Sequence, residues 1–519
     1  MSKYIIAIDR GSTNVKAVVF DKAGNEVFVS SVASQKPVSV HPGWWEQDMN
    51  IMWEGTVQAI KGVFENSKCD ASGQSAFSKR SFNEIKADDI LGVIVTGQGN
   101  GLMPVDKNGN PSRMGILSLD SRGAEIHNSW MADGRYMQAA QIVGMPFPAG
   151  SPLPLLSWFE KNQPEEFSKI DKILFSKDWI RFKLSGTLCT DQTDASGAGL
   201  MALAKNDYAW DVFNLLGLKS IKDKLPTIVP SHTVVGAVTR GASLETGLRE
   251  GTPVLCGAHD IAAYPFGVGT LDSKELVTVV GTWGLNLIAT KSLEGAIAAL
   301  YHCVPGYFIT GLGDGNSGGC LDIIVDTICQ NEKYQAAQFQ KSVYEVIEEE
   351  IEKTKPSSII FQPYIFGSLM NSSASAGFCG IKNWHTKADI MRAVYDGIVM
   401  GHYAYVQMIP GHESFKSMWL IGGGAKSKVF GQIFADITGL TVKTTETHEI
   451  TARGGALNAL VGLGICKSHE DACISPEISK LYEPNFQRHE FYQKKFGIFN
   501  QLSQTNAEVW STLNEMNKN

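Results

Sequence analysis

Residues 4–21, YIIAIDRGSTNVKAVVFD, contain two apolar segments separated by a short polar turn. The segments 4–8 and 15–20 are rich in β-branched residues, and the turn between them is rich in Gly, Ser and Thr. The stretch therefore predicts a β-hairpin. Its turn would expose backbone N–H groups and hydroxyls.

A second stretch repeats this pattern later in the chain. Residues 276–288, LVTVVGTWGLNLI, again place a turn of Gly and Thr between two apolar segments. We interpret this as a weak internal repeat, in which each half of the chain contributes one strand-turn-strand unit. Two similar domains would then face each other across one ligand, with residues 1–254 forming the first domain and residues 255–519 the second.

The remaining pattern predicts an α/β fold. Helical periodicity occupies roughly 155–161, 178–184 and 388–408, whereas 254–256 and 418–421 are typical of buried strands. Alternation of strands and helices is characteristic of α/β proteins. A polar stretch at 70–89 interrupts the pattern, and we expect it to be a surface insertion.

Composition excludes several classes of protein. A chain of 519 residues exceeds the size at which a single core stops growing, roughly 250–300 residues, so two domains are expected. No run of about 18 apolar residues is present, and the start lacks a secretory signal, so we expect a cytoplasmic location and no membrane partner. Nine scattered cysteines suit a reducing compartment, and a net charge of −7 does not favour nucleic acid as a partner.

The two turns have the chemistry that a triphosphate requires. Gly and Thr leave backbone N–H groups and hydroxyls open to an anion, and Asp9 beside the first turn is a candidate for binding Mg²⁺, directly or through water. The alternative is that each turn is an ordinary hairpin turn.

A third glycine-rich segment, 422–427 (GGGAKS), follows an apolar strand and allows a planar ring or ribose to approach the backbone. The chain has no P-loop motif, and no dinucleotide fingerprint follows the first strand, so any phosphate chemistry uses another device.

Asp260 is the candidate general base, because it follows a buried strand and precedes small residues. The alternative is a helix N-cap, and His259 beside it is typical of a hydrogen-bonded structural histidine.

Polar loop residues could supply hydrogen bonds to a polyhydroxylated ligand or satisfy their own backbone. The candidates are Gln98, Asn100, Asp120 and Arg122. Trp44 and Trp45 are candidates either for stacking on a sugar or for packing around the turn at Pro42 and Gly43.

Taken together, these motifs resemble the FGGY family of carbohydrate kinases over nearly the whole chain. The longest match is AGFCGI at 376–381, followed after seven residues by DIMRAVYD at 389–396. DRGSTNVK at 9–16, PGWWEQD at 42–48 and GGGAKS at 422–427 are similar to further motifs of the family.

This resemblance implies two actin-like, ribonuclease-H-like domains, with ATP, Mg²⁺ and a sugar meeting in an interdomain cleft. It implies that Asp260 is the catalytic base and that Asp9 binds the metal. The implied sugar-binding residues are Gly99, Asn100, Asp120 and Asp260. The implied nucleotide-binding residues are Gly11, Ser12, Thr13, Lys16, Gly281, Thr282, Gly318, Gly423, Gly424 and Lys428.

Departures from the family pattern bear on the substrate. Leu155 stands where the family usually has Lys, so no role is assigned there. Gly99–Asn100 replaces the Met-His of D-xylulose kinases and the Arg-Glu of glycerol kinases, and the tail 491–496 resembles the L-xylulose branch. We therefore expect an L-xylulose kinase.

Several alternatives stay open beside that expectation. They are a kinase of erythritol or another polyol, a D-xylulose or ribulose kinase, and an ATP-gated sugar sensor without catalysis. A homodimer is a further expectation.

Overall fold

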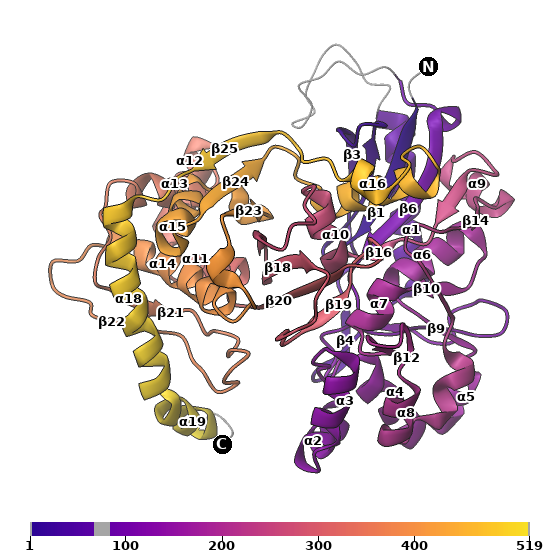
Figure 1. Ribbon diagram of the computed structural model, residues 1–519, viewed down its shortest axis with the longest axis horizontal. Coiled ribbons are helices and arrows are strands. Elements are labelled where there is room, and N and C mark those ends of the chain that lie inside the picture. The colour runs from indigo at the N-terminus through magenta and orange to yellow at the C-terminus, as the bar shows by residue number, and fades with distance from the viewer. Residues whose placement is uncertain (1–2, 67–83, 517–519) are drawn as a thin grey trace.

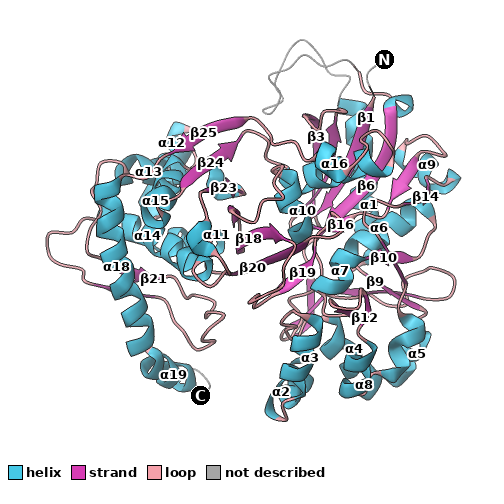
Figure 2. Cartoon of the chain, viewed as in Figure 1, coloured by secondary structure: helices cyan, strands magenta, loops and turns pink. Residues whose placement is uncertain are grey.

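The computed structural model describes residues 3–66 and 84–516, and its two large β-sheets lie in separate lobes (Figure 1). Residues 70–83 of the predicted insertion lie outside the described part. Helices surround both sheets, which confirms the predicted α/β class (Figure 2). In the described residues, no helix combines the length and the apolarity that a membrane span requires.

The first sheet has β1 at its centre, between an antiparallel neighbour, β2, and a parallel neighbour, β6. Its spatial order is β14 (Val234–Ala237), β15 (Pro253–Leu255), β6 (Ile90–Gly97), β1 (Tyr4–Arg10), β2 (Asn14–Phe20) and β3 (Glu26–Ala33), with β16 (Ala258–His259) also beside β6. The strands β1 and β2 are almost wholly buried, as expected for near-continuous apolar runs covered on both faces.

The second sheet has β17 in the equivalent place, between antiparallel β18 and parallel β23. Its order is β19 (Ala299–Tyr301), β20 (Phe308–Asp314), β18 (Gly284–Thr290), β17 (Glu275–Val280), β23 (Ser417–Ile421), β24 (Thr441–Thr445) and β25 (Ile478–Tyr482). The strands β3, β2, β1, β6 and β15 of the first sheet correspond to β20, β18, β17, β23 and β24 of the second. In both series the first two pairings are antiparallel and the last two are parallel. The predicted repeat is therefore confirmed, and each hairpin supplies the first two strands, in chain order, of its sheet.

The division after residue 254 remains a prediction. That point falls inside β15, which belongs with β16 to the first sheet, and β17 is the first strand of the second sheet.

Two helices, α10 (Asp260–Gly267) and α16 (Ile450–Gly462), form a layer shared by the two sheets. On one side their apolar residues pack against β1, β2 and β6, and on the other against β17 and β23. The helices touch through their backbones, since a Cβ at Gly267 would lie 2.1 Å from the Ile450 carbonyl oxygen and one at Gly454 would lie 2.2 Å from that of Ala263. Segments far apart in the sequence are thereby fixed to one another.

The opposite face of each sheet has its own helices. The first sheet is covered there by α1 (Met49–Asn66), α6 (Ser176–Ser185) and α9 (Arg240–Thr246). The second is covered by α11 (Gly318–Ile328), α13 (Val343–Ile351), α14 (Lys387–Val406), α15 (Lys428–Thr438) and α18 (Phe486–Thr505), with α12 (Gln330–Phe339) and α19 (Ala507–Met516) farther out (Figure 1).

A third apolar cluster lies below the first sheet and contains short helices and strands. Its helices are α2 (Ala124–Ala132), α3 (Arg135–Val143), α4 (Pro152–Asn162), α5 (Pro164–Lys169) and α8 (Trp210–Leu216), and α7 (Gln192–Gly197) and α17 (His469–Ala472) lie near the shared layer. A small three-stranded sheet contains β4 (Val38–His41), β5 (Trp44–Gln47) and β8 (Gly115–Ile116). The described residues also form two-stranded sheets, which pair β7 (Met103–Val105) with β9 (Lys172–Leu174), β10 (Cys189–Asp191) with β13 (Thr227–Val229), β11 (Met201–Ala202) with β12 (Asp207–Tyr208), and β21 (Ile360–Gln362) with β22 (Gly377–Cys379).

Candidate active site

Three strands of the first sheet end at the same edge. In the strand register Arg10 of β1 lies beside Gly97 of β6, and Gly97 lies beside His259 of β16. Asp9 comes directly before Arg10, and the loop from residue 98 to 101 and Asp260 come directly after the other two positions. The sheet therefore brings the predicted metal residue, sugar loop and base to one place.

Asp9 is half-buried at the end of β1, where its Oδ2 accepts a 2.8 Å hydrogen bond from Thr451 Oγ1. Burial raises the pKa of Asp9 to about 6, and the nearby Glu449 carboxylate adds to this rise, while Lys16 and Arg10 oppose it. This carboxylate is thus poorly neutralised by its surroundings. A bound cation would stabilise its charged form.

Asp9 fits a magnesium site in which the protein supplies one carboxylate ligand. The described residues contain no cluster of three or more His, Cys, Asp or Glu side chains that could enclose a metal. Mg²⁺ in kinases is often held by one or two carboxylates together with phosphate oxygens and water. Asp9 fits a site of that kind, in which the nucleotide supplies the remaining ligands.

The first turn leaves two hydroxyls open. Ser12 and Thr13 are exposed, and the Gly11 N–H closes the turn by donating to the Asn14 carbonyl oxygen at 3.0 Å. The predicted nucleotide-binding Lys16 faces Asp9 across the hairpin. Its ammonium donates to both carboxylate oxygens of Glu449 at 2.8 Å, so in this structure it is engaged with the start of α16.

The second turn lies against the start of α11. The Gly318 N–H donates to the Gly281 carbonyl oxygen at 2.8 Å, and a Cβ at Gly318 would lie 2.6 Å from that oxygen. Thr282 in this turn is exposed. The structure therefore brings these three predicted nucleotide-binding residues together, and Gly318 leaves no room there for a larger residue.

The third glycine segment reaches the same strand end. A Cβ at Gly424 would lie 2.3 Å from Val280 Cγ1, directly before the second turn. Gly423 is exposed in the short helical turn Gly423–Lys426, and Lys428 is exposed at the first position of α15. All the predicted nucleotide-binding residues of the second lobe thus lie around the end of β17 or at the start of α15.

Asp260 is the first residue of α10, and 26% of its side chain is exposed. Its Oδ1 accepts a 2.7 Å hydrogen bond from the Ile261 N–H and lies 3.2 Å from His259 Nε2. Burial raises the pKa of Asp260 to about 6; His259 opposes the rise and the charge of Asp9 adds to it. The N-cap of α10 is His259, without a side-chain cap hydrogen bond, so the alternative of an N-cap at Asp260 is wrong; the Ile261 contact leaves Oδ2 for other partners.

The sugar loop has an unusual lining. A Cβ at Gly99 would lie 2.7 Å from His259 Nε2 and 2.9 Å from Asp194 Oδ1, so a larger side chain does not fit there. Asn100 adopts a left-handed conformation with φ of 61°, and its buried Oδ1 has no hydrogen-bond partner among the described residues. An acceptor in that state is suited to a ligand hydroxyl.

Asp120 is buried, and its carboxylate is occupied. It accepts hydrogen bonds from the Trp45 N–H at 2.8 Å and from Arg122, through the backbone N–H at 2.9 Å and the guanidinium at 2.8 Å. The Arg122 guanidinium in turn stacks 4.4 Å from the Trp44 ring, which meets Trp158 edge-on at 5.0 Å. These contacts favour the packing alternative for Trp44 and give Asp120 a structural partner.

Sequence reasoning missed the residues that meet the site from elsewhere. Glu449 and Thr451 arrive from the end of β24 and the start of α16, and no motif marked them. It also missed a buried charged group below the sugar loop, in which Lys177 lies 2.7 Å from Asp178, 2.9 Å from Asp191 and 3.1 Å from Asp194. The available signal was a run of charges, at residues 177, 178, 181 and 183, interleaved with the apolar residues of a helical segment.

The long sequence signature has a structural explanation. Asp396 of α14 is fully buried and pairs with Lys495 at 2.7 Å and with the Tyr492 hydroxyl at 2.9 Å. The signature and the tail therefore hold α14 and α18 together, away from the three strand ends.

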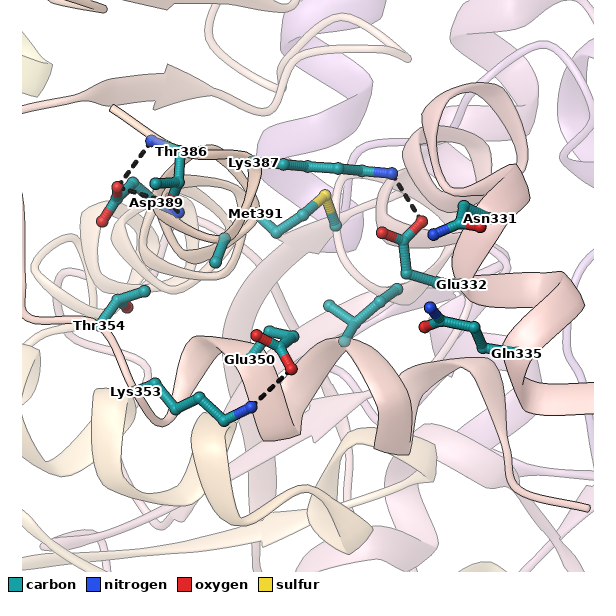
Figure 3. A pocket seen from close by; sticks show the side chains of 12 residues that line it. Asn331, Glu332, Gln335, Glu350, Lys353, Thr354, Thr386, Lys387, Asp389 and Met391 are labelled. Atoms are coloured by element: carbon teal, nitrogen blue, oxygen red, sulfur yellow. Dashed lines mark hydrogen bonds and ion pairs between the residues drawn. The ribbon is translucent and has the colours of Figure 1, made fainter. Parts of the chain in front are cut away.

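A cavity of about 620 Å³ lies elsewhere, between α12, α13 and the start of α14 (Figure 3). Four of its charged side chains form two pairs, Lys387 with Glu332 and Lys353 with Glu350, both at 2.6 Å. It contains none of the predicted site residues.

Comparison with known proteins gives two family matches and several similar proteins. The N-terminal domain of the FGGY family of carbohydrate kinases matches residues 4–267, and that family's C-terminal domain matches residues 276–463. The chain is 27% identical over 511 residues to L-xylulose/3-keto-L-gulonate kinase of Escherichia coli (strain K12), with 97% of each chain covered. It is 28% identical over 530 residues to xylulose kinase of Staphylococcus epidermidis (strain ATCC 12228 / FDA PCI 1200), with 99% of each covered.

Among solved structures, the ligand-bound xylulose kinase from Lactobacillus acidophilus superposes with a TM-score of 0.85 at 22% identity, covering 98% of this chain and 100% of that one. This likeness confirms the predicted fold of two actin-like, ribonuclease-H-like domains.

Proposed function

Because the chain belongs to the FGGY family of carbohydrate kinases, it is an ATP-using phosphotransferase with an alcohol group as acceptor, and we propose that this acceptor is a terminal hydroxyl of L-xylulose. The observation that carries the proposal is Asp260, a carboxylate with a raised pKa at the strand ends, beside a sugar loop that accepts only glycine at position 99. The name of the E. coli relative supports L-xylulose as the first candidate.

In the proposed reaction, Asp260 Oδ2 accepts the proton of the sugar hydroxyl. The hydroxyl oxygen forms a bond to the γ-phosphorus of ATP, the bond from that phosphorus to the β,γ-bridging oxygen breaks, and ADP leaves with that electron pair. Phosphoryl transfer depends mainly on alignment and charge stabilisation, so the base needs only to be correctly placed. A pKa near 6 leaves this carboxylate ionised at neutral pH and still basic enough to take a proton.

The phosphates would be held by the two turns. Thr13 and Thr282 offer exposed hydroxyls, one from each lobe, and Gly11 and Gly281 keep the backbone open beside them. Mg²⁺, bound beside Asp9, would offset the negative charge of the triphosphate. We place the sugar on the side of residues 1–254 and the nucleotide on the side of residues 255–519, with the active site in a cleft between the two domains.

We propose the cytoplasm as the location of this reaction. ATP is available there, and the cysteines within the described residues are free thiols, as expected in a reducing compartment.

The experiment is a screen of ADP release by the purified protein across L-xylulose, D-xylulose, D-ribulose, erythritol, glycerol and ketohexoses. We expect the highest kcat/KM with L-xylulose. A higher value with erythritol or another polyol, or with D-xylulose or ribulose, would replace the substrate and keep the reaction class. Sugar binding without ADP release for any of them would replace the enzyme with an ATP-gated sugar sensor.

The base assignment has its own test. Asp260→Asn keeps the hydrogen bond from Ile261 but removes the proton acceptor, so kcat should fall by roughly 10²–10⁴-fold. ATP binding should be preserved, and the melting temperature at neutral pH should not fall, because burial disfavours the charge that Asn removes. A variant that keeps more than about a tenth of the wild-type kcat would contradict the assignment.

A further inference from the structure

The imidazole of His259 contacts the carboxylate of Asp260. Its Nε2 is 3.2 Å from Asp260 Oδ1, and only 5% of the residue is exposed. The sequence pattern offered a structural histidine as the ordinary interpretation of this residue, and the proposed reaction does not use its ring. The contact with the base requires a separate explanation.

Two glycines leave room for the imidazole ring, one at each of its nitrogen atoms. A Cβ at Gly99 would lie 2.7 Å from His259 Nε2, and a Cβ at Gly197 would lie 2.9 Å from His259 Nδ1. Any larger residue at either position would push the ring away from Asp260. The sugar loop and α7 therefore leave the imidazole a space that suits this one orientation.

The backbone of His259 is fixed as firmly as its ring. Its N–H donates to Thr193 Oγ1 at 2.8 Å, and the Thr193 hydroxyl donates to Asp191 Oδ2 at 2.6 Å. Asp191 also pairs with Lys177 at 2.9 Å, and the side chains of both are wholly buried. A chain of satisfied polar contacts thus anchors the residue to the interior of the first lobe.

The chemistry of the contact follows from burial. Burial lowers the pKa of His259, so the imidazole is neutral and has one N–H donor and one acceptor nitrogen. A carboxylate oxygen accepts only, so the proton belongs on Nε2. His259 Nδ1 then has no partner among the described residues, which is consistent with its position against Gly197.

We propose that His259 is a positioning residue for phosphoryl transfer: its Nε2–H donates to Asp260 Oδ1 and thereby turns Oδ2 toward the sugar hydroxyl. The inference rests on the proposed role of Asp260 as the base. It also explains the small residue in the sugar loop, because the space that a side chain at Gly99 would need is occupied by the imidazole that orients the base.

The test compares His259→Gln with His259→Leu. Glutamine carries an N–H donor at about the reach of Nε2, whereas leucine removes the donor and keeps the bulk. We expect His259→Leu to lower kcat for the preferred sugar by roughly 10–100-fold, as is typical when an orienting partner is lost, with KM for ATP unchanged. His259→Gln should recover most of this loss.

If His259→Leu does not fold, His259→Asn replaces it, because the shorter amide does not reach Asp260. His302→Leu and His302→Gln are the matched controls. His302 is also buried, but its Nδ1 accepts from the Val304 N–H at 2.8 Å. We expect these variants to lower the melting temperature without the difference in kcat between Leu and Gln.

Two failures can be told apart. An active Asp260→Asn variant would overturn the proposed base, and the positioning role would fall with it. An inactive Asp260→Asn variant, combined with equal kcat values for His259→Leu and His259→Gln, would overturn the positioning role alone.

Discussion

The two hairpins have the same topology and opposite chemistry. Two residues before the first turn, Asp9 faces Lys16 across the strands; at the matching place in the second hairpin, Val279 faces Leu285. Both pairs meet the shared layer of α10 and α16. The first pair does so through Thr451 and Glu449, whereas the second packs against Ile450 and Tyr264.

This difference shows how a repeated unit acquires one active site. The backbone of both turns can approach a phosphate, but only the first hairpin adds a carboxylate and an ammonium beside its turn. The second contributes a glycine turn and apolar packing, so under the proposed function the carboxylate for the metal comes from the first hairpin. The comparison can be tested by exchanging or removing these residues.

The largest expected effect comes from placing the charge of the first hairpin in the second. Val279 is 5% exposed and belongs to the apolar cluster that contains Trp419 and Ile450. Val279→Asp should lower the free energy of unfolding by about 3–5 kcal/mol, because the carboxylate would be buried without a partner. Denaturant midpoints would measure this, with Val279→Ala as the control for lost volume. Equal losses for the two variants would contradict the comparison.

The reverse change in the first hairpin should spare the fold and impair the reaction. Asp9→Asn keeps an oxygen acceptor for Thr451 but loses the charge, so kcat/KM for Mg·ATP should fall roughly 10–100-fold, as when metal affinity is weakened. Stability should not fall, because burial already disfavours the charged form of Asp9. Titration of activity with Mg²⁺ measures the effect. An unchanged Mg²⁺ requirement would remove Asp9 from the metal site.

The pH dependence should follow Asp260. Its pKa of about 6 exceeds the ordinary value of 3.8, so kcat/KM for the sugar should fall roughly tenfold per pH unit below about 6. The folded protein also binds this proton more tightly than the unfolded chain does. The contribution of Asp260 to the free energy of unfolding therefore decreases as the pH rises from about 4 to about 6.

Asp260→Asn supplies the control for stability, since its unfolding curve should lack this decrease. Identical pH dependence of stability in the wild type and the variant would contradict the raised pKa.

The smallest expected effect concerns the ion pair between the first hairpin and the start of α16. Lys16 and Glu449 are partly exposed, so a double-mutant cycle with Lys16→Met and Glu449→Gln should give a coupling free energy of about 1 kcal/mol. Raised salt should reduce it. A coupling that vanishes at low salt would show that the contact does not help to join the first hairpin to α16.

Local structure was largely predictable from local sequence. The second predicted hairpin appears as β17 and β18, and the helix predicted at 388–408 is observed at Lys387–Val406. Its start is marked by Thr386 and Asp389, which form a capping box, and Pro410 follows its end. Such signals lie within a few residues of the feature that they predict.

The site was only partly predictable. Local patterns singled out the turn residues, and the family resemblance singled out Asp260; the structure places Asp9 and Asp260 at neighbouring strand ends, and their roles stay predictions. Asp120 shows the limit of this reasoning, because its burial and its hydrogen bond from Trp45 depend on two segments, 75 residues apart, that meet only in the folded protein. Sequence patterns identify a polar side chain but not the partners that occupy it.

The sequence by itself determined the two hairpins, the glycines of their turns and the membership of the chain in one kinase family. Backbone conformation and family motifs depend on short, contiguous patterns. Only the tertiary structure decided which charges meet at the strand ends, since Thr451 bonds Asp9 across 442 residues of sequence and Glu449 pairs with Lys16 across 433. Contacts of that range are set by the packing of α10 and α16 between two sheets, which no local pattern encodes.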